Sequence, residues 1–369
     1  MLSMPKILFI FPQKQPCGIL DYSESLLTAL GKYGFEIKTA APPSDSSRLD
    51  ALLADAENYN IIHVQYDAAY WTVNGKNIFS TFAKTVSKPI VITLHEVYDQ
   101  NPFDFPYDSV RSLVPGLAVL KRFLYRKRHP NFTSELELCK QNYFAKTIIV
   151  HNEFQKETLI KKGVAGDIIR VIPHGVWDSK KSPFRANPQK WVFGTFGFIS
   201  PSVDYAVALE ALSSLNIDWE YVIGGGPRRA EQAPLVDEIT HCAEKLGVRS
   251  RVKLTGPVEE EKIPDFFQTL DIYLAPFKFK SSSGSLNRAL SAALPCVAPR
   301  IPLTEEMNVR VPALALYEQD DLQSMRSVIQ KLTGDVKYRI QCVQHSCEYA
   351  ERYSFTHEAE QLFRLYGKI

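Results

Sequence analysis

Short apolar runs rich in β-branched residues alternate along the chain with longer segments of helical periodicity. After the first run, Leu20, Leu26, Leu27 and Leu30 recur at the spacing of one helix face. The first half contains six such runs, which we predict to be strands: Lys6–Phe11, Phe35–Ala40, Ile61–Tyr66, Pro89–His95, Thr147–His151 and Arg170–Pro173. This alternation predicts an α/β fold with a doubly wound parallel sheet.

A polar, proline-bearing stretch, Trp177–Lys190, interrupts the pattern, which then begins again. The second set of predicted strands is Trp191–Phe198, Asp218–Gly226, Arg251–Gly256, Asp271–Pro276 and Pro295–Pro299, with helices at Tyr205–Leu215, Ala230–Leu246 and Leu286–Ala293. At 369 residues the chain is too long for one ordinary core. We therefore predict two domains, residues 1–176 and 177–348, with a C-terminal helix of about 349–369 that packs back on the first.

Composition narrows the class of protein. The net charge of +2 argues against a nucleic-acid binder that works through its overall field. Six cysteines without a CxxC pair suit free thiols in a reducing compartment, and Cys342, His345 and Cys347 lack a fourth ligand for zinc. No signal-peptide pattern is visible and no apolar run approaches the roughly 20 residues that span a bilayer. We expect a cytoplasmic protein, attached at most to the inner face of a membrane.

One predicted strand-to-helix joint concentrates positive charge and small hydroxyl residues. Lys278 and Lys280 precede three serines and Gly284, after which the helix begins. The backbone N–H groups of Ser283 to Leu286 would lie unpaired at the positive end of that helix, where they favour an anion. We predict a phosphate cradle here; the alternative is a serine N-cap on an ordinary helix.

Several other residues carry two interpretations. His63 and Gln65 end a strand, so they fit a hydrogen-bonded core role as well as acceptor binding. His174 caps a turn or touches a ligand, whereas His151 and Glu153 fit the orientation of a helix start. The run Ile223–Glu231 does not fit a dinucleotide fingerprint, because Arg229 occupies its third glycine position.

Eight segments in the correct order resemble the GT-B glycosyltransferases, specifically the glycosyltransferase family 4 type. They span nearly the whole chain: PCGILDYSESLLTAL, IIHVQ, VITLHE, TIIVHNEFQKETLIKKGV with RVIPHGV, FGTFGFISPSVDYAVALEAL, YVIGGGP, RVKLTGPVEEEKIPDFFQTLDIYLAP and SSSGSLNRALSAALPCVA. The resemblance implies two Rossmann-like domains that face a cleft, with the nucleotide-sugar donor against the second domain.

The resemblance also implies roles for individual residues. Gly18 matches a first-loop glycine near the donor phosphates, and His95 matches a histidine that faces the donor sugar. Val258 matches a main-chain contact to the base, and the diphosphate is implied on Ser283, Gly284, Ser285 and Leu286. Such enzymes retain the anomeric configuration and usually need no metal, so we expect no cofactor.

The chain departs from the family pattern at four charged positions. Phe198 and Val203 stand where an arginine and a lysine usually hold the diphosphate, and Lys280 and Arg288 replace the glutamates of an E-x7-E pair. We expect Lys280, with Lys278 beside it, to supply the missing charge as a catalytic cation, and Arg288 to be the less direct candidate. Asn287 is the candidate ribose ligand.

The segment Val110–Pro130 carries a stripe of leucines and a crowd of lysines and arginines, as interfacial helices do. It predicts binding to an anionic membrane surface, or an ordinary connecting helix packed on the first domain.

Together these features predict a retaining hexosyltransferase that moves a sugar from a UDP-sugar, or less favoured a GDP-sugar, to a saccharide or lipid-linked acceptor in polysaccharide or glycolipid biosynthesis. Two alternatives stay open: a catalytically silent GT-B protein that senses nucleotide sugars or partners an active transferase, and a GT-B sugar-nucleotide epimerase. Release of free nucleotide, binding without turnover, and an altered sugar still attached to nucleotide distinguish the three.

Overall fold

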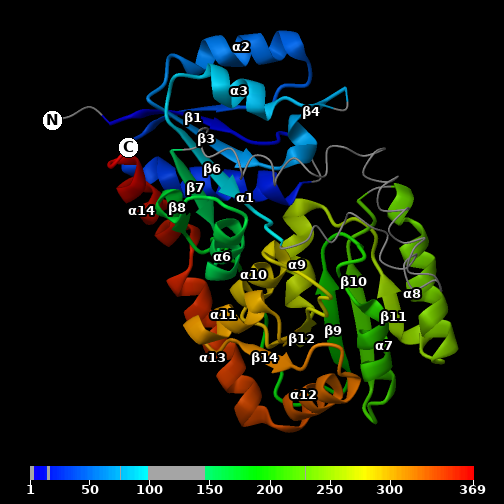
Figure 1. Ribbon diagram of the computed structural model, residues 1–369. Helices are drawn as coiled ribbons and strands as arrows, with labels where there is room; N and C mark the ends of the chain where they lie inside the picture. Colours follow the sequence, from blue (N-terminus) through cyan, green and yellow to red (C-terminus); the bar gives the residue numbers. More distant parts are fainter. Residues whose placement is uncertain (1–3, 15–16, 75, 99–145, 229) are drawn as a thin grey trace. The chain divides into compact units, whose positions relative to one another are not determined.

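The computed structural model describes residues 4–14, 17–74, 76–98, 146–228 and 230–369 (Figure 1). These residues form two compact units: unit 1 is Met1–Gly175 with Phe355–Ile369, and unit 2 is Val176–Ser354. The chain therefore passes between the units twice, and residues from Phe355 onward belong to unit 1. The basic segment Val110–Pro130 lies outside the described residues, as does Cys139.

Unit 1 contains a six-stranded parallel sheet in the order β2-β1-β3-β6-β7-β8. Its strands are β1 (Lys6–Ile10), β2 (Glu36–Ala40), β3 (Ile61–Tyr66), β6 (Ile90–Leu94), β7 (Thr147–Val150) and β8 (Ile169–Val171). All six predicted strands of the first half are confirmed. Every residue of β3 and β6 is buried, which is why these central strands read as nearly continuous apolar runs.

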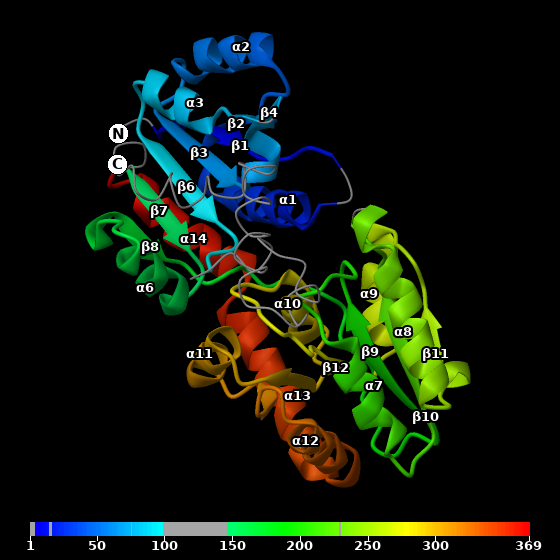
Figure 2. The ribbon, with the colours of Figure 1, turned by 45° about the vertical axis from the view of Figure 1, so that its right-hand side comes forward.

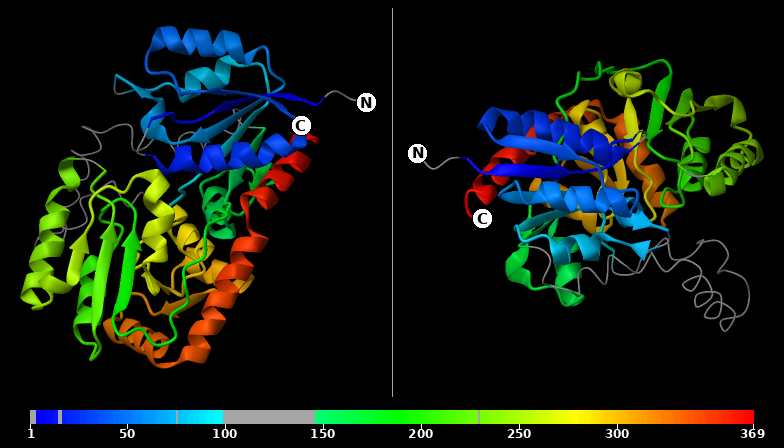
Figure 3. Two further views of the ribbon diagram at one scale, coloured as in Figure 1. Left: turned by 180° about the vertical axis from the view of Figure 1, so that it is seen from behind. Right: turned by 90° about the horizontal axis from the view of Figure 1, so that it is seen from above.

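Helices cover both faces of this sheet. Figure 3 shows α1 (Gly18–Leu30, blue) and α14 (Phe355–Tyr366, red) side by side. The core on the opposite face includes side chains of α2 (Ser46–Ala56), α3 (Phe79–Thr85) and α6 (Glu153–Lys161). The smaller elements are η1 (Gly31–Tyr33), η2 (Ala68–Trp71), η5 (Gly166–Ile168) and the hairpin of β4 (Thr72–Val73) and β5 (Lys76–Asn77).

Unit 2 contains a second six-stranded parallel sheet, in the order β11-β10-β9-β12-β13-β14. Figure 2 labels the first four of these strands. Its strands are β9 (Trp191–Phe196), β10 (Trp219–Gly224), β11 (Val252–Leu254), β12 (Ile272–Leu274), β13 (Cys296–Pro299) and β14 (Leu314–Tyr317). The predicted α/β fold class is thus confirmed for both halves. Strand β14 was not predicted from the sequence.

Two groups of helices enclose the second sheet. Side chains of α7 (Tyr205–Ser213), α8 (Pro234–Lys245) and α12 (Leu322–Gly334) share one core cluster, and those of α9 (Ile263–Gln268), α10 (Gly284–Ser291) and α11 (Pro302–Arg310) share another. The long helix α13 (Val336–Arg352) contributes to both. The turns η6 (Ala230–Gln232), η7 (Arg249–Arg251) and η8 (Glu260–Lys262) complete the unit. None of the helices in the described ranges is long and apolar enough to cross a bilayer.

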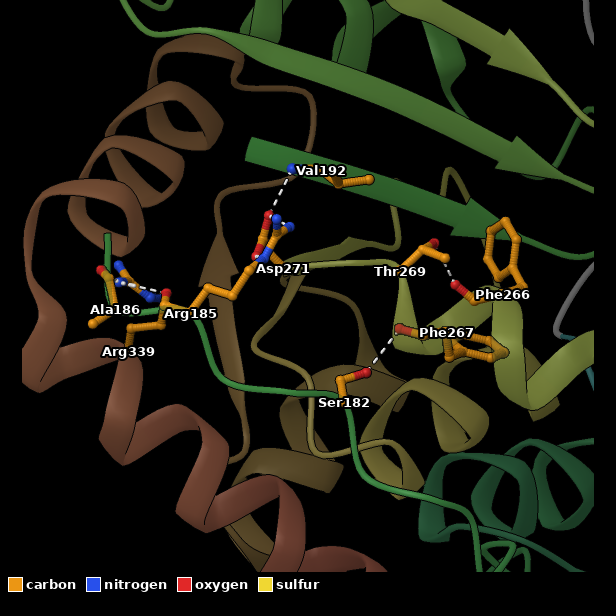
Figure 4. A network of polar contacts seen from close by, with 9 residues as sticks. All are labelled: Ser182, Arg185, Ala186, Val192, Phe266, Phe267, Thr269, Asp271 and Arg339. Carbon is orange, nitrogen blue, oxygen red and sulfur yellow. Dashed lines mark hydrogen bonds and ion pairs between the residues drawn. The ribbon is translucent and has the colours of Figure 1, made fainter. Parts of the chain in front are cut away.

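The polar stretch that follows the first crossing is fastened to unit 2 by two buried charges (Figure 4). Arg185 pairs with Asp271 in a bidentate manner, at 2.7 Å for Nε to Oδ1 and 2.5 Å for Nη2 to Oδ2. The same carboxylate accepts the N–H of Val192 at 2.7 Å. Buried Arg339 donates to the carbonyl oxygens of Leu332 and Ala186, and its guanidinium lies 4.7 Å from the ring centroid of Trp191.

Asp271 is therefore the anchor of this stretch. Burial raises its pKa, while the Val192 N–H and Arg185 favour its charged form. The residues between the first crossing and β9 behave as part of unit 2 and not as a free linker, because a buried carboxylate is stable only while its partners stay in place.

We predict that Asp271→Ala lowers the free energy of unfolding by about 2 to 3 kcal/mol, because the Val192 N–H and the Arg185 guanidinium lose their partner. Denaturant unfolding of the full chain measures this. Glu259→Ala is the matched control: Glu259 pairs with Lys262 at 2.5 Å, but both side chains are exposed and the pair contributes little. Equal effects of the two substitutions would contradict the anchoring role.

Candidate functional site

The loops that leave β9, β10 and β11 in unit 2 are joined by backbone hydrogen bonds beyond the strand ends. Gly197 donates to the carbonyl of Gly224 at 2.9 Å, and Gly225 donates to that of Gly256 at 2.9 Å. Gly225 has φ +119°, and a Cβ atom there would collide with the carbonyl oxygen of Gly197. Glycine is thus required where the two loops meet, and the result is a surface made largely of backbone.

Helix α10 begins beside this surface, at the carboxyl end of β12. Ser283 is its N-cap in extended conformation, with φ −150° and ψ 101°, and its hydroxyl accepts the N–H of Leu286 at 3.2 Å. The Ser285 hydroxyl lies 3.2 Å from that of Ser283. A Cβ atom at Gly197 would lie 3.8 Å from Cβ of Ser285, so the β9 loop adjoins the first turn of α10.

The predicted cradle differs in one respect from the structure. We expected the N–H of Leu286 to be unpaired, but the Ser283 hydroxyl satisfies it, as a serine N-cap does. Among the described residues, the N–H groups of Gly284 and Ser285 make no hydrogen bond. The N–H of Ser283 likewise has no acceptor among the described residues, so three of the four expected backbone donors are available to an anion at this helix end.

The predicted cations and polar ligands have different surroundings. Lys278 Nζ lies 3.9 Å from the carboxylate of Asp204, and the guanidinium of Arg288 lies 4.1 Å from the ring centroid of Trp177. Lys280 is half-buried directly ahead of the serines. Asn287 is buried in the first turn of α10, and Val258 is half-buried in the loop after β11. All of these residues belong to unit 2.

In unit 1, polar side chains gather where β3 and β6 end. Buried His63 contacts the hydroxyl of Thr93 at 2.8 Å and that of Tyr366 on α14. Gln65 Nε2 lies 3.4 Å from His63 Nε2, while Gln65 Oε1 lies 2.8 Å from His95 Nε2. Burial lowers the pKa of His63 to about 3, which supports the interpretation of His63 as a hydrogen-bonded core residue.

His95 has a hydrogen-bond partner at one of its two ring nitrogens. Its Nε2 faces the Gln65 carbonyl and therefore carries the proton, and its Nδ1 lies 3.4 Å from His151 Nε2. Burial lowers its pKa well below the usual value, with further lowering from His151, His174 and His63. At neutral pH the His95 side chain is thus an uncharged imidazole. The predicted contact between His95 and a donor sugar stays a prediction.

His151 and His174 continue this cluster. His151 is buried, and its Nδ1 donates to the carbonyl oxygen of Ile172 at 3.0 Å. The N-cap of α6 is Asn152, whose side chain accepts the N–H of Gln155, so His151 does not cap that helix. The His174 ring lies 4.8 Å from that of Tyr22, and its Nδ1 donates to the carbonyl of Gly175 at 2.7 Å.

Glu358 on α14 is the buried carboxyl group of the same region. Its Oε1 contacts the Tyr22 hydroxyl, and its Oε2 accepts the N–H of Gly175 at 2.7 Å. Burial raises the pKa of Glu358 to about 8, although both hydrogen bonds favour its charged form. A neutral carboxyl at pH 7 is consistent with a site that has no cation among these contacts.

Gly18 is the first residue of α1, and a Cβ atom there would have no described atom within 4 Å. Packing therefore does not require glycine at this position. Across the described ranges, no group of three or more His, Cys, Asp and Glu side chains could hold a metal ion.

The structure thus brings Ser283, Gly284 and Ser285 together with the glycine loops of unit 2. It places Gly18 and His95 in unit 1. Sequence analysis missed Tyr22 and Glu358, whose pairing joins residues 336 positions apart. The available signal was weak: Glu358 lies one helical turn from Leu362 on the apolar side of its helix.

Comparison with known proteins addresses unit 2 directly. Residues 192–335 match the family model described as Glycosyl transferases group 1, and this segment contains the glycine loops and α10. Residues 192–335 are thus similar to the group 1 glycosyl transferases.

Relatives and solved structures agree with this domain. A D-inositol 3-phosphate glycosyltransferase of Corynebacterium urealyticum (strain ATCC 43042 / DSM 7109) is 26% identical over 150 residues, which cover 40% of this chain and 35% of that protein. The alignment therefore spans about a third of the length of that curated relative.

Two solved structures resemble the whole chain. HepE of Anabaena, in complex with UDP and glucose, has a TM-score of 0.74 at 16% identity and covers 100% of both chains. Sucrose-phosphate synthase from Thermosynechococcus elongatus has a TM-score of 0.75 at 14% identity over 98% of each. The expected GT-B fold is confirmed.

We predict that Glu358→Gln changes the pH dependence of stability. The folded-state pKa of about 8 lies above the ordinary value of 4.5, so wild type loses stability as pH rises from about 5 to 8 and the unfolded carboxyl ionises. Glutamine keeps an acceptor for the N–H of Gly175 and does not titrate. The free energy of unfolding of the variant should therefore rise relative to that of wild type from pH 5 to pH 8. Unfolding at pH 5, 6, 7 and 8 measures the difference.

Glu360→Gln is the matched control, because Glu360 lies on the same helix but pairs with Arg364 at the exposed surface. If the free energies of unfolding of wild type and Glu358→Gln differ by the same amount at all four pH values, Glu358 is not a buried neutral carboxyl.

Proposed function

We propose that this protein transfers a sugar from a nucleoside-diphosphate sugar, with UDP-sugar favoured, to a saccharide or lipid-linked acceptor with retention of configuration. The observation that carries this proposal is the start of α10 inside the group 1 domain. There the N–H groups of Gly284 and Ser285, beside glycine loops, face no acceptor among the described residues.

This arrangement suits the diphosphate of a donor. Backbone N–H groups at a helix N-terminus favour an anion by about 0.3 to 2 kcal/mol. The diphosphate gains negative charge as its bond to the sugar breaks, so fixed donors stabilise the transition state more than the bound substrate. Lys280, directly ahead of the serines, is the proposed cation.

Further support comes from the nature of the neighbours. HepE, which matches over the full length, binds UDP, and one of its structures contains UDP-glucose. The chemistry proposed for this chain needs no metal, since backbone donors and lysine supply the positive field. Location in the cytoplasm and attachment of Val110–Pro130 to an anionic membrane remain predictions from the sequence.

A catalytically silent sensor of nucleotide sugars is the second candidate. It is favoured by His95, whose Nε2–H is already bound to the side-chain carbonyl of Gln65. A sugar hydroxyl that accepts from this N–H would have to displace Gln65. The sensor and the transferase differ in turnover and not in binding.

The decisive experiment presents the full chain with UDP-glucose, UDP-galactose, UDP-N-acetylglucosamine and GDP-mannose, and measures release of free nucleotide together with thermal stabilisation. A bound donor raises stability by about 2.7 kcal/mol at a hundredfold excess over its dissociation constant. Stabilisation by UDP-sugars with slow hydrolysis supports a transferase, and stabilisation without hydrolysis supports the sensor. No stabilisation by any nucleotide sugar would refute both.

We predict that substitutions of the two proposed catalytic residues differ in their effect on UDP binding. His95→Ala should leave the affinity for UDP nearly unchanged but reduce turnover by about tenfold or more, because its contact matters as charge develops on the sugar. Lys280→Ala should weaken UDP binding and reduce turnover by about a hundredfold. Calorimetric titration with UDP and nucleotide-release assays separate these effects; unchanged turnover in His95→Ala would assign that residue to the buried network alone.

A further inference from the structure

Arg228 and Phe198 form a pair at the edge of the group 1 domain that no predicted role includes. The guanidinium carbon of Arg228 lies 5.5 Å from the centroid of the Phe198 ring, within reach of a cation–π interaction. Phe198 follows β9 and Arg228 follows β10, so both come from the glycine loops described above.

The backbone holds both residues in place. Parallel pairing of β9 and β10 continues past the strands, because Ile199 donates to the carbonyl of Gly226 at 3.0 Å and bridges to Pro227. Phe198 directly precedes this bridge on one strand extension, and Arg228 directly follows it on the other. Pro227 also restricts the backbone immediately before Arg228.

The same loop contacts the start of α10. A Cβ atom at Gly197 would lie 3.8 Å from Cβ of Ser285, so Phe198 directly follows a residue that adjoins the first turn. The ring of Phe198 is half-buried, whereas Arg228 is exposed. The aromatic ring thus supports the guanidinium at the carboxyl edge of the sheet, which is the edge where α10 begins.

Two other cations occur at this edge. Lys278 lies near Asp204, and Arg288 lies over Trp177 with Glu260 4.0 Å from its Nη2. A guanidinium presents several N–H donors in one plane and can bind two phosphate oxygens at once. A lysine ammonium attracts phosphate only as a point charge.

We propose that Arg228, supported by Phe198, binds the diphosphate group of the nucleotide donor together with the first turn of α10. This inference rests on the proposed function for the identity of the donor, but its physical content is a diphosphate site. Arg228 contacts the charged phosphates and not the base. It therefore contributes to the binding of UDP and of inorganic pyrophosphate, but not to the binding of uridine.

The test is calorimetric titration of the full chain with UDP, uridine and inorganic pyrophosphate, for wild type and Arg228→Met. We expect the variant to bind UDP and pyrophosphate about tenfold more weakly or worse, with uridine affinity unchanged. The loss should shrink as salt rises. Equal weakening for UDP and uridine, or no weakening of either anion, would overturn the proposal.

Arg251→Met is the matched control. Arg251 also lies over an aromatic ring, 5.3 Å from the centroid of Trp219, but it precedes β11 and therefore lies at the opposite, amino end of the sheet. It should bind all three ligands as wild type does. Phe198→Leu keeps the arginine but removes its support, and should lose part of the affinity for both anions.

Failure of this inference is distinguishable from failure of the proposed function. If wild type binds no nucleoside diphosphate, the proposed donor is wrong, but pyrophosphate binding still tests the anion site. Weaker pyrophosphate binding in Arg228→Met than in wild type and Arg251→Met then supports the inference. Pyrophosphate binding that is the same in all three proteins, or absent from all three, overturns it.

Discussion

The buried carboxyl of Glu358 holds together the two ends of unit 1, and the rest of that unit depends on this contact. It joins the N–H of Gly175, the last residue before the chain leaves, to α14, which begins where the chain returns. Through the Tyr22 hydroxyl it also reaches α1. A parallel sheet needs both faces covered, and α1 and α14 together provide one of those covers. A Cβ atom at Gly175 would collide with the ring of Phe355, so the fit at this point leaves no room for another residue.

The polar groups of the two units are stabilised in different ways. Unit 2 builds a surface from backbone donors and glycine loops, where positive charge is added by side chains around the rim. Unit 1 instead buries a neutral set of imidazole, amide and carboxyl groups, in which partners satisfy one another. A backbone surface tolerates the replacement of individual side chains, which explains how Phe198 and Val203 can stand where related proteins are expected to carry cations. A buried network has no such tolerance, since one lost partner leaves another group unsatisfied.

Much of the fold was predictable because it depends on local pattern. Eleven of the twelve strands that form the two large sheets follow from apolar runs, and only β14 was not predicted. The start of α10 was predictable too, because serine capping is a local effect. The Ser283 hydroxyl accepts the N–H of Leu286, which is then not available to a ligand. The sequence alone did not show whether this N–H binds the cap or a ligand.

The partners of buried groups were not predictable for a physical reason. Glu358 meets Tyr22, and Asp271 meets Arg185, through contacts that depend on where distant segments pack. Burial then changes the chemistry, since the pKa of Glu358 moves to about 8 and that of His63 to about 3. The polar stretch Trp177–Lys190 likewise read as a linker, because composition alone does not reveal that Arg339 and Asp271 hold it down. Arg228 escaped notice since its partner, Phe198, lies thirty positions earlier.

The return of α14 to unit 1 sets an order of events during synthesis on the ribosome. Strands β1 to β8 emerge first, but the sheet face that α14 covers, with His63 and Tyr22, stays incomplete until residues 355–366 have been made. Unit 2, which is continuous in sequence, can complete its core while the earlier half still waits. Of the two units, the one that is translated first is therefore the last to finish folding, and in the interval its uncovered apolar face is exposed to chaperones and to aggregation.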